Sequence, residues 1–121
     1  MDYSNPIYST YFVQAATIST AAEVMNITGP SGKQGRLIDV TFTTTLGVTV
    51  AADLLSVGTA ADADAYGTLV VPIQAIDAVT NGVTDLTSDS NLITADTQVV
   101  VSAAGTSTAG AGSIAVTIAW F

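Results

Sequence analysis

The last nine residues of the chain alternate strictly between two sets of side chains. One set is large and apolar, and the other is mostly small: Ile114, Val116, Ile118 and Trp120 against Ala115, Thr117, Ala119 and Phe121. Successive side chains of a β-strand point to opposite faces, so this period of two predicts a strand with one buried face. The set that contains Trp120 is therefore predicted to lie in the core, and not to form a sugar-stacking platform.

A second strand with the same period is predicted from Ile38 onward. Ile38, Val40 and Phe42 alternate with Asp39, Thr41 and Thr43. The apolar set is predicted to face the core, and the polar set to face solvent or an interface. The core is expected to rest mainly on this strand and on the strand at residues 113–121.

Six more strands are predicted from runs of β-branched and aromatic residues between turn residues. They cover residues 11–18, 24–28, 54–59, 68–76, 92–95 and 97–103. Thr20 and Glu23 also fit a capping box, so a helical turn at residues 19–25 is an alternative to the second of these strands. We favour the strand because the whole chain is rich in Thr and Val.

Turn residues separate these segments. Pro72 has no amide hydrogen to donate, which predicts an edge strand or a break at that point. Thr80-Asn81-Gly82 predicts a turn, and residues 86–91 a polar connection. The glycine- and alanine-rich segment at residues 105–112 predicts a flexible loop.

About eight short strands without a convincing helix predict an all-β fold. The open alternatives are an antiparallel β-sandwich, a jelly roll and a barrel, and a jelly-roll-like sandwich is our first choice. A chain of 121 residues fits one domain, residues 1–121. Residues 1–10, which include Asn5-Pro6, Tyr3 and Tyr8, are expected to form an extended arm that fastens to a neighbour.

The composition predicts a partner-bound protein. Hydrophobic residues make up 49% of the chain and charged residues only 10%, against about 25% charged in an average soluble domain. Such a surface exposes small apolar groups unless partners cover them, so we expect an oligomer or an assembly component. The net charge of −8 argues against binding to nucleic acid or anionic lipid. No secretion signal or apolar run of membrane-spanning length is recognised.

The glycine-rich segment at residues 29–35 superficially resembles a phosphate-binding loop. A Walker A loop needs a glycine five positions before its Gly-Lys pair and a Ser or Thr after the lysine. This chain has Ile27 and Gln34 there. The segment also precedes a strand, whereas phosphate loops open a helix. We therefore predict a turn that carries Lys33 and, just after it, Arg36, with contact to an acidic neighbour as the functional alternative.

Catalytic and metal chemistry find little support in the sequence. Asp62 and Asp64 resemble the start of a calcium loop, but Tyr66 stands at the next ligand position and no glutamate closes the loop. Whether these two aspartates bind calcium is left open. With no His and no Cys, the usual general base and thiol nucleophile are missing. We expect no enzyme activity, no catalytic residue, no metal site and no cofactor.

Three segments together resemble the small capsid decoration (cement) proteins of tailed bacteriophages. They are residues 27–40, residues 57–67 and the terminal Val116-Thr-Ile-Ala-Trp-Phe121. The resemblance implies a jelly-roll or β-sandwich subunit, commonly a homotrimer, on the exterior of the virion. It would clamp neighbouring major capsid subunits against the pressure of the packaged DNA.

The resemblance gives no catalytic residues, and the expected contacts with partners come from the residues themselves. Tyr3, Pro6 and Tyr8 of the arm, together with Lys33 and Arg36, are our candidates for partner contact. The alternative function is a carbohydrate- or receptor-binding β-sandwich of the head-fibre or tail-fibre type.

Overall fold

The computed structural model describes residues 6–82 and 92–121. These residues form nine β-strands and no helix, so none of them belongs to a helix that could cross a membrane. The strands are β1 (Ile7–Thr17), β2 (Ala22–Ile27), β3 (Gly35–Thr49), β4 (Asp53–Gly58), β5 (Gly67–Val71), β6 (Val79–Asn81), β7 (Leu92–Ile93), β8 (Val99–Ala103) and β9 (Ala109–Trp120).

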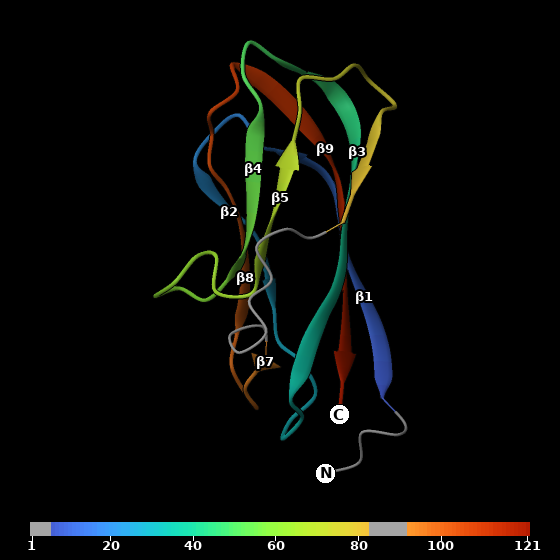
Figure 1. Cartoon of the computed structure of the whole chain (residues 1–121), viewed down its shortest axis with the longest axis vertical. Coiled ribbons are helices and arrows are strands. Elements are labelled where there is room, and N and C mark those ends of the chain that lie inside the picture. Colours follow the sequence, from blue (N-terminus) through green and yellow to red (C-terminus); the bar gives the residue numbers. More distant parts are fainter. Residues whose placement is uncertain (1–5, 83–91) are drawn as a thin grey trace.

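The strands make two antiparallel sheets that pack face to face (Figure 1). Sheet A has the order β1-β9-β3-β6, with β7 paired to β3, and sheet B has the order β2-β8-β4-β5. Apart from the two-residue β7, the pairs β1/β9, β2/β8, β3/β6 and β4/β5 match the first strand with the last, the second with the one before it, and so on inward. This is the topology of a jelly roll, so the predicted fold class is confirmed.

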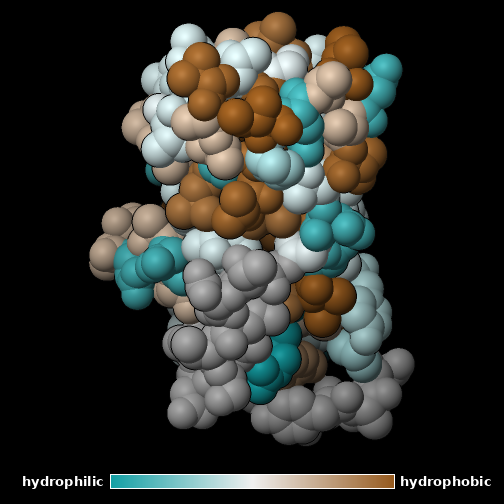
Figure 2. All heavy atoms as spheres, turned by 45° about the horizontal axis from the view of Figure 1, so that its top comes forward, coloured by the Kyte–Doolittle hydropathy of each residue, from teal (hydrophilic) through white to brown (hydrophobic). Residues whose placement is uncertain are grey.

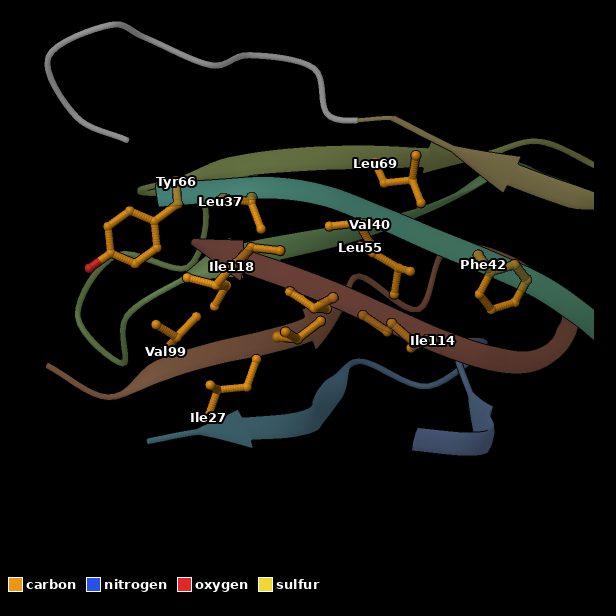
Figure 3. Packing of buried hydrophobic residues seen from close by; sticks show 14 of the residues in the cluster. Ile27, Leu37, Val40, Phe42, Leu55, Tyr66, Leu69, Val99, Ile114 and Ile118 are labelled. Atoms are coloured by element: carbon orange, nitrogen blue, oxygen red, sulfur yellow. The ribbon is translucent and has the colours of Figure 1, made fainter. Parts of the chain in front are cut away.

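The core lies between the sheets, where side chains from both inner faces meet (Figure 3). Ile114, Val116 and Ile118 of β9 are fully buried, and Trp120 is 2% exposed. The period of two in the last strand therefore predicted its buried face correctly. Val99, Val101 and Ala103 of β8 face them from sheet B and are buried as well.

The predicted face of Ile38 is wrong. The register between β3 and β9 shifts between Leu37 and Asp39, which marks a β-bulge. The extra residue reverses the alternation, so Leu37 is buried and Ile38 is 49% exposed, whereas Val40 and Phe42 lie in the core as predicted.

Several boundaries also differ from the sequence-based expectation. The strand predicted at residues 68–76 ends at Val71, since Pro72 has no amide hydrogen to continue the pairing. Residues 7–10, placed in the arm, belong to β1 and pair with β9. Thr80 and Asn81, expected to form a turn, pair with β3 as part of β6. Residues 109–112, expected to be loop, belong to β9. The first part of the predicted arm, residues 1–5, and the polar connection predicted at residues 86–91 lie outside the described residues.

The small residues of β9 have a packing reason. A Cβ on Gly112 would come within 2.4 Å of the Thr43 carbonyl oxygen and 2.5 Å of the Phe42 ring. Only a glycine lets the strand approach its neighbour so closely, so a composition typical of a loop here belongs to a packed strand.

Candidate interaction surfaces

Among residues 6–82 and 92–121 there is no pocket, so we consider the chain's surfaces. Two of them stand out. The first is the solvent-facing side of sheet A, here called the outer face. It consists of residues from three strands: Tyr8, Thr10 and Phe12 of β1; Ser113, Ala115, Thr117 and Ala119 of β9; and Arg36, Asp39, Thr41 and Thr43 of β3.

Small side chains fill the centre of the outer face because β9 alternates large inward residues with small outward ones. The hydroxyls of Thr10 and Thr117 lie 3.0 Å apart across β1 and β9. On the edge strand β1, Tyr8 and Phe12 are 64% and 62% exposed. The result is a strip of small side chains with two exposed aromatic rings on the neighbouring edge strand.

The register brings two predicted partner-contact residues onto one row of this face. Tyr8 lies opposite Ala119, and Ala119 lies opposite Arg36. Directly paired residues of neighbouring strands project to the same side. Ala119 is only 6% exposed although it faces outward, as expected between two larger side chains.

The other predicted contact residues lie around the same end of sheet A. Pro6 directly precedes β1 and is partly buried, and Lys33 is exposed in the turn before β3. Tyr3 lies outside the described residues. The structure thus gathers Pro6, Tyr8, Lys33 and Arg36 where β1 and β3 begin and β9 ends.

The glycine-rich segment at this end covers the indole ring of Trp120. A Cβ on Gly29 would lie 2.3 Å from the ring, and one on Gly35 would lie 2.7 Å from it. The indole Nε1 donates a hydrogen bond to the Tyr11 hydroxyl at 3.1 Å. Gly29 and Gly35 are therefore needed for close packing on the ring, and the segment has a structural role.

The tip of the same segment is a β-turn. Lys33 N donates to the Pro30 carbonyl oxygen at 3.2 Å, and Gly32 has a φ of 73°. Gly32 N also donates to Asp96 Oδ1 at 2.9 Å, which ties the turn to the connection between β7 and β8. These contacts match the predicted turn between strands.

The second surface lies at the opposite end, where β3 leads to β4 and β5 leads to β6 (Figure 1). We call it the apical patch. Its members are aliphatic side chains between 55% and 76% exposed: Leu46, Val50, Ile73, Ile76 and Val79. Figure 2 shows hydrophobic side chains gathered on this end of the molecule.

Backbone hydrogen bonds bring the two segments of the apical patch together. Val48 and Gln74 form a β-bridge. Asp77 N donates to the Thr44 carbonyl oxygen at 2.9 Å, and Val79 pairs with Thr43. Residues 73–79 therefore run along the last third of β3 and place their aliphatic side chains beside those of residues 46–50.

The turn after β3 holds Val50 in a strained conformation. Val50 has a φ of 73°, and Ala51 N donates to the Thr49 carbonyl oxygen at 2.9 Å. This is a γ-turn with a positive φ at its central residue, which is rare and strained, above all for a β-branched residue. Val50 is 76% exposed, so this turn presents an aliphatic side chain to solvent.

A buried carboxylate follows this turn at the start of β4. Asp53 is 1% exposed and accepts hydrogen bonds from Leu54 N at 2.9 Å, Gly105 N at 3.0 Å, Ser107 N at 3.0 Å and the Ser107 hydroxyl. Burial alone would raise the pKa of Asp53, but these hydrogen bonds outweigh it, and the pKa lies below its usual 3.8. Asp53 thereby fastens the β8–β9 connection to the start of β4.

The aspartates at 62 and 64 form a pair in the exposed β4–β5 connection. Hydrogen bonding to Asp64 raises the pKa of Asp62. Within the described ranges, no three acidic side chains lie close enough together to hold a metal ion.

No protein-family model matches this sequence, and no curated protein matches it. The apical patch escaped the sequence-based prediction because Ile73 and Ile76 lie in the segment predicted as the strand 68–76, and no pattern marked Leu46, Val50 and Val79 as exposed neighbours of that segment. One signal was present: Asp77 is the only charged residue in residues 43–52 and 72–82.

Proposed function

We propose that this protein is a structural subunit that decorates the exterior of an icosahedral bacteriophage head and cements neighbouring major capsid subunits. The observation that carries the proposal is the outer face of sheet A. It combines a strip of small side chains with two exposed aromatic rings, Tyr8 and Phe12. Exposed aromatic residues are typical anchors of protein interfaces.

The jelly-roll fold and the resemblance of three sequence segments support the same proposal by analogy. The mechanism is mechanical. A subunit that binds the assembled shell, and not its free components, stabilises the shell by mass action. When several copies are linked, as in the proposed homotrimer, each bound copy raises the effective concentration of the next.

Binding to shells tests the proposal directly. The purified protein should bind expanded heads built from the major capsid protein encoded with it, and should raise their melting temperature. Replacing both Tyr8 and Phe12 with serine should weaken binding by about tenfold or more, because anchors of this kind dominate interface energies. Cosedimentation and calorimetry of the heads provide the measurements.

The matched control is Val70→Thr, which changes a half-exposed residue on β5 of the other sheet. This variant should bind like the wild type. Wild-type protein that neither sediments with the heads nor changes their melting temperature would rule the proposal out.

The same two aromatic rings support a carbohydrate-binding module as the second candidate. Tyr8 and Phe12 lie on one face of one strand, and sugar rings stack on exposed aromatic side chains. A glycan array separates the two functions. A signal that disappears in the double serine variant would favour sugar binding, whereas a lattice clamp should give no signal.

A further inference from the structure

The apical patch is distinct from the outer face used in the proposed function. It is aliphatic throughout and has no aromatic or cationic residue among its five members: Leu46, Val50, Ile73, Ile76 and Val79. Contiguous apolar surface of this kind on a water-exposed end usually marks a binding site. The question is which partner covers it.

Strain at Val50 argues that this exposure has a use. A residue in the left-handed region persists only where surrounding contacts fix it. Thr108 N donates to the Thr49 carbonyl oxygen at 3.1 Å, and the Thr106 hydroxyl donates to the Ala52 carbonyl oxygen at 2.6 Å. Together with the hydrogen bonds of the buried Asp53, these bonds fix the turn after β3, in which the Val50 side chain is exposed.

The distribution of charged residues indicates which partner covers the apical patch. The chain has a net charge of −8, so two copies repel one another. Exposed carboxylates lie on β2, on the β4–β5 connection and on the β7–β8 connection: Glu23, Asp62, Asp64 and Asp96. Residues 43–52 and 72–82, which form the apical end, contain one charged residue, Asp77.

A foreign protein could offset the negative charge with basic residues of its own and would have no need of a charge-poor contact. A second copy cannot, because it carries the same excess of acid. Lys33 and Arg36, the two cations of the chain, lie where β3 begins, whereas the apical patch lies where β3 ends. They therefore do not face Asp77 across a contact between two apical patches. An apolar, nearly charge-free contact is therefore what self-association of this chain requires.

We propose that copies of this chain associate through the apical patch, with Val50 at the centre of the contact. The inference rests on the proposed assembly of copies and not on the shell. It names the surface that joins subunits and leaves the outer face of sheet A free for the shell.

Sedimentation velocity of the purified full chain tests the inference. Wild-type protein should associate reversibly at micromolar concentrations. Val50→Gly should weaken association by about tenfold or more, while its melting temperature stays unchanged or rises, because glycine accepts a φ of 73° without strain.

A matched pair of variants separates the apical patch from general loss of apolar surface. Ile76 is 60% exposed in the patch, and Ile38 is 49% exposed at the bulge of β3. Ile76→Thr should weaken association by about tenfold, and Ile38→Thr should leave it within about twofold of the wild type. Both keep a β-branched side chain, so their melting temperatures should agree closely.

Salt provides an independent readout. Association through the apical patch should become stronger as the salt concentration rises, since salt screens the repulsion between acidic copies. Association through Lys33 and Arg36 should weaken instead, and that result would overturn the inference. So would a wild type that stays monomeric at about 100 μM, where even a weak interface would populate oligomers, or equal effects of Ile76→Thr and Ile38→Thr.

The outcome is separable from that of the proposed function. Protein that associates through the apical patch but ignores phage heads would remove the proposed function alone. Protein that binds heads but stays monomeric would remove this inference alone.

Discussion

Replacing Gly29 with alanine should lower the melting temperature of this protein by roughly 10 °C, because the new methyl group must displace the Trp120 ring. An ideal Cβ at this position lies 2.3, 2.5 and 2.6 Å from three carbons of the indole. The ring is rigid and 2% exposed, so the strain cannot be relieved by moving a flexible side-chain end. We expect a loss of about 3 kcal/mol, at the upper end for overpacked cores.

Gly32→Ala is the matched control in the same segment. Gly32 has a φ of 73° and open space where its Cβ would stand, so only the backbone conformation opposes the substitution, at about 1–2 kcal/mol. Trp120 is the one tryptophan of the chain, and its fluorescence should shift to longer wavelength in Gly29→Ala but not in Gly32→Ala. A larger loss of stability in Gly32→Ala would contradict the packing role assigned to Gly29.

Removing the Asp53 carboxylate should destabilise the fold nearly as strongly. Asp53→Ala leaves the buried amide of Ser107 and the partly buried amide of Gly105 without their acceptor. Because several hydrogen bonds to a charged group are lost together, we expect a decrease of about 2–4 kcal/mol in the free energy of unfolding. Chemical denaturation at neutral pH measures it.

The pH dependence of Asp53→Asn tests the role of the charge. The pKa of Asp53 is lowered in the folded state from its usual 3.8. The carboxylate therefore stabilises the fold above about pH 4, and this contribution is lost as the pH falls through the folded-state pKa. The difference in melting temperature between wild type and Asp53→Asn should be largest at pH 7 and should shrink toward pH 3.

Asp77→Asn is the control for this titration. Asp77 is exposed at the same end of the molecule, and its φ of 71° is one that asparagine tolerates. This variant should melt close to the wild type across the range. A constant difference between wild type and Asp53→Asn from pH 7 to pH 3 would show that the charge of Asp53 does not stabilise the fold.

The sequence predicted those parts of the fold in which the alternation of side chains continues without a bulge, or in which a single residue ends a strand. Strict alternation in β9 placed Trp120 in the core, and Pro72 marked the end of β5, an edge strand of sheet B. Alternation failed at Ile38 because a bulge inserts one residue, and a pattern of single residues does not register a shift relative to a neighbouring strand.

The sequence patterns did not predict contacts between segments that lie far apart in the chain. Gly29 and Gly35 resembled parts of a phosphate loop, and only the position of Trp120 explains them. Ile73 and Ile76 of the apical patch fell in a predicted strand, and nothing local marked the patch as exposed. Their exposure follows from how residues 73–79 lie along β3, which depends on pairing across some thirty positions of the chain. The gathering of Tyr8 and Arg36 around Ala119 likewise depends on register.

The position of β9 between β1 and β3 affects how the protein reaches its fold during synthesis. The ribosome produces this internal strand after the other described strands, so the edges of β1 and β3 that pair with it stay without this partner until then. Sheet A can close only when Trp120 has left the ribosome. Folding should therefore be a late and comparatively slow event that follows synthesis of the whole jelly roll.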